Sequence, residues 1–241
     1  MGKEYYVASC VFTSRFPQLS DKIQRYLRER YDMPIVRCCI PKYKLKEYEE
    51  KMPEQYRSGW RSLPDCATFG AGDVVYSVCH NCSNIIEETR SGVKTVSLWE
   101  LILLDDSFVY PDFSNMKVTV QDCWRSKERH SEQLAVRSLL KKMGIDFVEL
   151  NENMNRTEFC GNSLYKPQPA RNPKLAPLHY EVNAQGKFLP HTIEEQEKIM
   201  KEYCKQFSTD DVICYCHYCL EGLLMGGVNG KHIAELLFDE K

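Results

Sequence analysis

Short apolar runs that end on cysteine recur along the first half of the chain, and runs of this kind are typical of buried strands. Three of them occupy residues 5–10, 34–39 and 73–79. Between the first two, Leu19, Ile23 and Leu27 share one face at helical spacing, which predicts a helix from about Ser20. A polar connection is predicted over residues 42–64, with a helix at 44–52 within it. A helix at 82–89 and a further apolar segment at 93–104 follow the third strand.

The same order of elements returns in the second half of the chain. Strands are predicted at residues 117–123, 145–150 and 211–216. The helix that follows the first of these strands carries an apolar stripe made of Val136, Leu139, Leu140 and Met143. Gly144 is a suitable C-terminal cap for it. Thr192 and Glu195 have the spacing of a capping box, which predicts a helix that runs to about Phe207. An apolar segment at 232–237 closes the pattern.

One motif is written twice, as DVVYSVCHNC at residues 73–82 and DVICYCHYC at residues 211–219. Its repetition indicates a duplicated chain, and strands that alternate with helices predict an α/β fold with mainly parallel sheets. We therefore expect two tandem, pseudo-symmetric α/β lobes at residues 1–112 and 113–241. Ligand sites in open α/β sheets lie beyond the carboxyl ends of the strands. The cysteine clusters are expected at those strand ends.

Composition narrows the class of protein. The chain has 241 residues, of which 43% are hydrophobic and 27% charged, as in soluble globular proteins. The net charge of −2 argues against a general nucleic-acid binder. The chain shows neither a signal-peptide pattern nor an apolar run of membrane-spanning length, so we expect a cytoplasmic protein without a transmembrane segment. Twelve cysteines in that reducing compartment favour metal binding or redox chemistry over a disulfide scaffold.

The first lobe offers five clustered thiols, from Cys10, Cys38, Cys39, Cys79 and Cys82. Soft sulfur ligands select zinc, Cu(I) or iron–sulfur centres. A structural zinc site and an ordinary four-iron, four-sulfide (4Fe–4S) cubane each take four thiolates. A fifth thiol is one more than either centre requires.

The second lobe offers four clustered thiols, from Cys123, Cys160, Cys216 and Cys219. They suit a 4Fe–4S cluster or zinc equally well, and Phe159 stands where the first cysteine of a pair would be. Cys214 is a spare ligand or a core residue.

The remaining candidates have other predicted roles. Cys66 and Cys204 are expected to pack structurally, as unclustered cysteines commonly do. His80 and His217 each follow the first cysteine of a Cys-x-x-Cys pair. We expect each to hydrogen-bond a cluster sulfur or a backbone carbonyl rather than to bind metal.

A cysteine, then Cys-Cys, then Cys-x-x-Cys, in tandem copies, resembles the cysteine-rich CCG domain family. The opening YYVASCVFTSRFPQLSDKI and the later CCIP are most similar to the B-type subunit of heterodisulfide reductase. The resemblance covers nearly the whole chain. Neither half carries a full Cys-Cys-Gly: the first reads Cys38-Cys39-Ile40 and the second Phe159-Cys160-Gly161.

The resemblance implies a non-cubane 4Fe–4S cluster on the five cysteines of the first lobe, and a second 4Fe–4S cluster or zinc on the four of the second. It implies an oxidoreductase acting on sulfur groups, which reduces or forms a small disulfide at the first cluster. The chain has no Gly-x-Gly-x-x-Gly fingerprint and no ferredoxin-type cysteine run, so a flavoprotein or ferredoxin-like subunit is expected to donate the electrons. Alternative interpretations are an electron-transfer subunit of a lactate- or glycolate-type dehydrogenase and a zinc-binding interaction protein.

Overall fold

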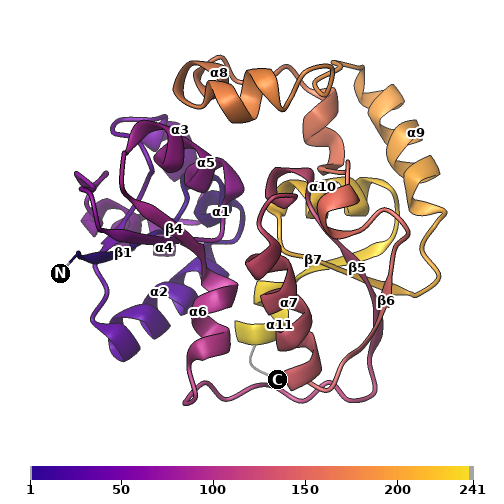
Figure 1. The fold of residues 1–241 in the computed structure, drawn as a ribbon, viewed down its shortest axis with the longest axis horizontal. Helices are drawn as coiled ribbons and strands as arrows, with labels where there is room; N and C mark the ends of the chain where they lie inside the picture. The colour runs from indigo at the N-terminus through magenta and orange to yellow at the C-terminus, as the bar shows by residue number, and fades with distance from the viewer. Residues whose placement is uncertain (1, 239–241) are drawn as a thin grey trace. The chain divides into compact units, whose positions relative to one another are not determined.

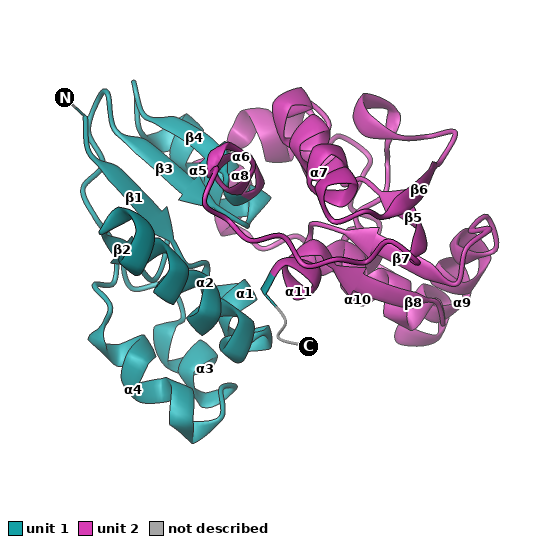
Figure 2. Cartoon of the chain, turned by 90° about the horizontal axis from the view of Figure 1, so that it is seen from below, with its two compact units in different colours: residues 1–98, 238–241 teal, residues 99–237 magenta. Residues whose placement is uncertain are grey.

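The computed structural model describes residues 2–238, which fold into two compact units (Figures 1 and 2). Unit 1 holds residues 2–98 with Phe238, and unit 2 holds residues 99–237. The contacts thus divide the chain at 98/99, whereas the sequence suggested 112/113. Each unit contains a four-stranded sheet in which every pairing is parallel. The predicted α/β class with parallel sheets is therefore confirmed.

The sheet of unit 1 has the strand order β2-β1-β3-β4. Its strands are β1 (Glu4–Val7), β2 (Ile35–Val36), β3 (Val74–Ser77) and β4 (Lys94–Ser97). The helices that begin in this unit are α1 (Cys10–Arg15), α2 (Pro17–Tyr31), α3 (Leu45–Glu50), α4 (Glu54–Ser62), α5 (His80–Thr89) and α6 (Leu98–Leu104). Tyr6 and Val75, on the central strands, and Ile23, Leu27 and Ile85, on the helices, are fully buried.

The first turn of unit 1 differs from the sequence prediction. The strand predicted over residues 5–10 stops at Val7, because the backbone of Ser9 turns into a positive φ of 61° and Cys10 then begins α1. Helix α2 starts at Pro17, whose fixed φ suits a first helical position, rather than near Ser20. The polar connection holds a second helix, α4, that the sequence pattern did not indicate.

The sheet of unit 2 has the order β6-β5-β7-β8, which repeats that of unit 1 strand for strand. Its strands are β5 (Lys117–Gln121), β6 (Asp146–Glu149), β7 (Asp211–Cys214) and β8 (Asn229–His232). Its α-helices after α6 are α7 (His130–Lys142), α8 (Arg171–Leu175), α9 (Ile193–Cys204), α10 (His217–Met225) and α11 (Ile233–Phe238), the last of which ends in unit 1. Shorter helical turns are η1 (Trp124–Ser126), η2 (Met154–Arg156), η3 (Gly161–Tyr165) and η4 (Leu178–Val182).

Two predicted helix caps of unit 2 are present. The Thr192 side chain accepts from the Glu195 N–H and the Glu195 carboxylate accepts from the Thr192 N–H, which completes the capping box of α9. The helix ends at Cys204, three residues before the predicted end. Gly144 follows α7 with a φ of 74°, a conformation that favours glycine.

A buried carboxylate joins three segments of unit 2. Arg137 of α7 donates two hydrogen bonds to Asp122, at 2.9 and 2.7 Å, and both side chains lie almost entirely out of solvent. The Met154 N–H and the Tyr215 hydroxyl each donate to the same carboxylate at 2.7 Å. Asp122 follows the end of β5, and Tyr215 follows the end of β7. This network therefore fixes two neighbouring strand ends and the loop after β6.

We expect Asp122→Asn to lower the free energy of unfolding by about 3–5 kcal/mol, because it leaves the buried guanidinium of Arg137 without its main counter-charge. Urea unfolding of the full chain measures the loss. Glu149→Gln is the matched control: Glu149 binds the same arginine, but its side chain is 36% exposed, so we expect a loss below about 1 kcal/mol. Equal losses in the two variants would contradict this account.

Candidate metal centre

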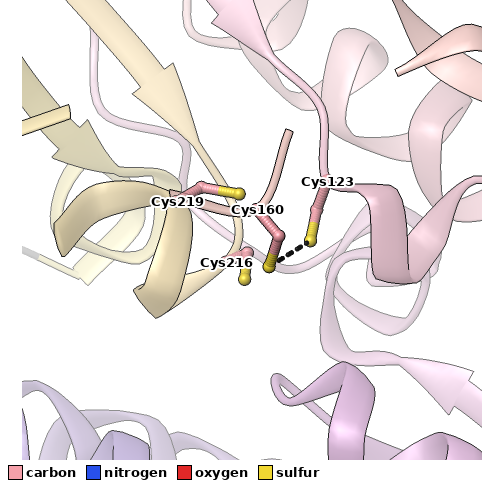
Figure 3. A group of neighbouring side chains, drawn as sticks. All are labelled: Cys123, Cys160, Cys216 and Cys219. Atoms are coloured by element: carbon pink, nitrogen blue, oxygen red, sulfur yellow. Dashed lines mark hydrogen bonds between the residues drawn. The ribbon is translucent and has the colours of Figure 1, made fainter. Parts of the chain in front are cut away.

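The four cysteines predicted for the second lobe meet in unit 2. Their sulfur atoms all lie within 4.8 Å of one another, and all four residues are buried (Figure 3). Cys123 and Cys216 each stand two residues beyond a strand, and Cys160 immediately precedes η3. Cys219 lies on α10. The sulfurs of Cys123 and Cys160 are 3.4 Å apart. The carboxyl ends of parallel strands thus bring distant ligands to one sheet edge, as the topology requires.

Glycine allows the Cys160 segment to reach this edge. Gly161 has a φ of 58°, and a Cβ there would overlap the carbonyl oxygen of Tyr218 on α10. Gly222, one turn later on α10, lies against the Cα of Gly161. The two glycines let η3 and α10 approach closely, so Cys160 comes beside Cys216 and Cys219.

Phe159 belongs to the core and adds no ligand. Its ring stacks on Tyr203 at a centroid distance of 4.1 Å and an interplanar angle of 12°. Its carbonyl accepts from the Trp124 N–H at 2.8 Å and from the Cys219 thiol. Phe159, which stands in the place of a fifth cysteine, therefore links the segments that carry Cys123, Cys160 and Cys219.

Arg125 gives the site a buried positive charge. Its Nη1 donates to the sulfur of Cys160 and, at 3.0 Å, to the hydroxyl of Ser163. Burial would lower the pKa of this guanidinium, but the nearby thiols, Cys160 foremost, hold it well above its ordinary value. Burial raises the pKa of the Cys160 thiol, yet hydrogen bonding with Cys123 and Cys219 and the charge of Arg125 outweigh it and leave that pKa lowered.

Two other thiols of the set, those of Cys123 and Cys219, have raised pKa values. Burial, followed by the neighbouring thiols, raises the pKa of Cys123 and Cys219 well above the ordinary value. Four buried sulfurs can all be thiolates only beside a cation, because like charges in one site oppose each other's ionisation. A thiol set of this kind fits a thiophilic metal. Zn²⁺–sulfur bonds of about 2.3 Å imply edges of about 3.8 Å for a tetrahedron, which the observed spacing accommodates.

The five cysteines of the first lobe lie in unit 1 and are buried. Cys10 begins α1, Cys38 and Cys39 follow β2, Cys79 caps α5, and Cys82 lies within α5. The sulfurs of Cys10 and Cys38 are 3.4 Å apart. Cys82 hydrogen-bonds with Cys79 and Cys39. The structure thus brings Cys10 beside Cys38, and Cys82 beside both Cys79 and Cys39.

Ser9 supports this set and was not singled out from the sequence. Its hydroxyl hydrogen-bonds with Cys79 and accepts from the Phe12 N–H at 3.5 Å. The pKa of Cys79 is lowered to about 6, mainly by the hydrogen bond from Cys82 and further by that from Ser9. A positive φ at a residue other than glycine, such as the 61° of Ser9, is uncommon and concentrates at functional sites.

The other sequence candidates fall outside the two sets. Cys214 is the buried last residue of β7 and lies 3.6 Å from the Cys216 carbonyl oxygen, as expected for packing. Burial raises the pKa of Cys204, at the end of α9, to about 11. Cys66 is half-buried and contacts the Ala67 carbonyl. His80 and His217 begin α5 and α10 and are buried.

No family model matches this sequence, and no curated protein matches it. Among solved structures, an aspartate racemase homologue from Pyrococcus horikoshii OT3 is similar at 13% identity and a TM-score of 0.29, over 99% of this chain and 96% of that one. No helix within residues 2–238 is both long and apolar enough to cross a bilayer.

We expect Gly161→Ala to disrupt the unit 2 centre, because the added methyl group overlaps the Tyr218 carbonyl and the backbone φ is unfavourable for alanine. The variant should unfold at lower urea and bind less metal than the wild type. Gly186→Ala is the control: its φ is 74°, but a Cβ there meets open space, so only the conformational cost of about 1–2 kcal/mol remains. Metal content and unfolding midpoints that are the same in both variants would contradict the role of close approach.

Proposed function

We propose that the chain is an iron–sulfur oxidoreductase subunit that reduces, or forms, a small disulfide at the five-cysteine set of unit 1. The observation that carries the proposal is that set itself: five buried thiols, drawn from three strand ends, which is one more than a tetrahedral ion or a cubane takes. The resemblance to CCG-domain proteins supports the same assignment.

The reaction needs an electron source outside this chain. A disulfide that accepts two electrons and two protons yields two thiols, and in the reverse direction the electrons leave. We infer a flavoprotein or ferredoxin-like partner as the donor. A cluster held by the five cysteines would pass electrons singly and supply an iron that stabilises a departing thiolate.

The residues of unit 1 support such a centre in two ways. Burial of the five sulfurs keeps water from them. The low pKa of Cys79, about 6, makes one thiolate available near neutral pH before any metal arrives.

For unit 2 we propose a single tetrahedral ion, zinc. Each thiolate of a cubane binds a different iron, so the sulfurs of a cubane stand farther apart than those around one ion. Mutual distances within 4.8 Å favour the single ion. The same compactness favours a second candidate function, a zinc-stabilised interaction protein without redox activity, if unit 1 also takes zinc.

Iron, zinc and acid-labile sulfide per chain, with EPR of the anaerobic protein before and after addition of a thiol, test the proposal. We expect iron with sulfide, one zinc, and a signal that the thiol alters. Zinc without acid-labile sulfide would contradict the redox proposal and favour the zinc-stabilised interaction protein. Clusters indifferent to thiol would favour an electron-transfer subunit of a lactate- or glycolate-type dehydrogenase.

We expect Cys39→Ser to lose or convert the iron centre while the zinc content is unchanged, because Cys39 lies in unit 1 beside Cys82. Metal analysis and EPR measure both. Cys66→Ala serves as control and should leave iron, sulfide and zinc as in the wild type, since this half-buried thiol hydrogen-bonds to the Ala67 carbonyl and lies outside the five-cysteine set. Unchanged iron and EPR in Cys39→Ser would refute the ligand assignment.

A further inference from the structure

Arg125 is a buried arginine that lacks a carboxylate partner within residues 2–238. It is 7% exposed, and its Nε is buried without a hydrogen-bond acceptor in the described structure. Its guanidinium lies between three aromatic rings, with distances to their centroids of 5.6, 5.7 and 5.3 Å for Trp124, Phe188 and Tyr218. The polar contacts of the guanidinium are those with Cys160 and Ser163. A buried charge is retained in proteins where it is paired, and here the available anion is sulfur.

The charge balance of the proposed centre explains this placement. Four thiolates around a divalent ion leave two negative charges in excess, in a site whose ligands are at most 3% exposed. A guanidinium in contact with one thiolate offsets part of that excess. The low local dielectric strengthens the attraction. The aromatic rings add cation–π stabilisation and hold the guanidinium against Cys160.

At this position of the repeat, unit 2 has a cation and unit 1 does not. Arg125 stands two residues after Cys123, the first ligand of its set, and Phe12 stands two residues after Cys10 in unit 1. Both positions are buried. The Phe12 side chain carries no charge, and its ring packs on that of Phe16 at a centroid distance of 5.3 Å. The duplication of the chain therefore does not account for the arginine, whereas its contact with Cys160 does.

We propose that Arg125 is a positioning residue of the unit 2 metal centre, where its guanidinium holds the Cys160 sulfur in place and offsets the charge of the thiolate-bound metal. The proposal rests on the metal site proposed above. It assigns to Arg125 a control of metal affinity that is independent of any reaction at unit 1.

The test is a titration of the metal-free, reduced full chain with Co²⁺, followed by competition with Zn²⁺. Sulfur-to-cobalt charge-transfer bands report thiolate coordination, and the bands lost in Cys219→Ser are those of unit 2. Arg125→Gln should weaken binding at these bands by about 10- to 100-fold, the usual effect of removing a hydrogen-bond partner of a metal ligand. Lys201→Gln, which removes an exposed positive charge from α9, should bind as the wild type does.

Wild-type affinity in a folded Arg125→Gln chain would overturn the proposal and leave the metal site intact. Absence of unit 2 bands in the wild type would overturn the site and this proposal together. If Arg125→Gln does not fold, the same titration of Arg125→Lys tests the proposal. Its ammonium keeps the charge but not the planar fork that reaches Cys160 and Ser163, so we expect several-fold weaker binding, and unchanged affinity would refute the role of the guanidinium.

Discussion

The carboxylate of Asp122 is the interaction on which the geometry of unit 2 depends. It binds Arg137 from α7, the backbone of Met154 and the hydroxyl of Tyr215, which lie 15, 32 and 93 residues away in sequence. Cys123 follows Asp122 directly, and Cys216 follows Tyr215 directly. A single buried anion therefore sets the positions of two ligands through their neighbours in the chain. Such a network favours a single arrangement of these segments. If one partner moved away, the others would become buried polar groups without a hydrogen bond, which costs free energy.

The two units share a topology but differ at the residues that line their sulfur sets. Ser9 precedes the first ligand in unit 1, where unit 2 has Asp122; Ile40 follows the later ligand in unit 1, where unit 2 has Gly161. The glycine permits the close approach of η3 to α10 that compacts the four sulfurs of unit 2. Unit 1 has five buried cysteines, and the Ser9 hydroxyl hydrogen-bonds with one of them, Cys79. The two sheets share one topology, and the side chains beside the two cysteine sets differ.

Much of this arrangement could be predicted from the sequence because it follows from short-range patterns. Apolar runs ending near cysteine mark parallel strands whose carboxyl ends meet, and Thr192 with Glu195 marks the start of α9. Other features leave no local signal. Strand β8 has the polar sequence NGKH and forms because β7 offers it a partner. The turn at Ser9 occurs at a residue type without special preference for positive φ. The contacts of Arg125 with Cys160 and of Tyr215 with Asp122 join residues that the sequence does not relate.

The ionisation of the buried thiols links metal binding to the stability of unit 2. Hydrogen bonds with Cys123 and Cys219, and then the charge of Arg125, lower the pKa of Cys160 against the effect of burial, whereas burial raises the pKa values of Cys123 and Cys219. A metal that binds all four must displace the protons of the raised pair, so its apparent affinity increases with pH until those thiols ionise. Since the four cysteines come from segments that only the folded unit assembles, a metal bound by all four would bind the folded state and would stabilise it increasingly as the free metal concentration rises. The scaffold around Asp122 lowers the cost of that assembly, because the ligand-bearing segments are already held in place before the ion arrives.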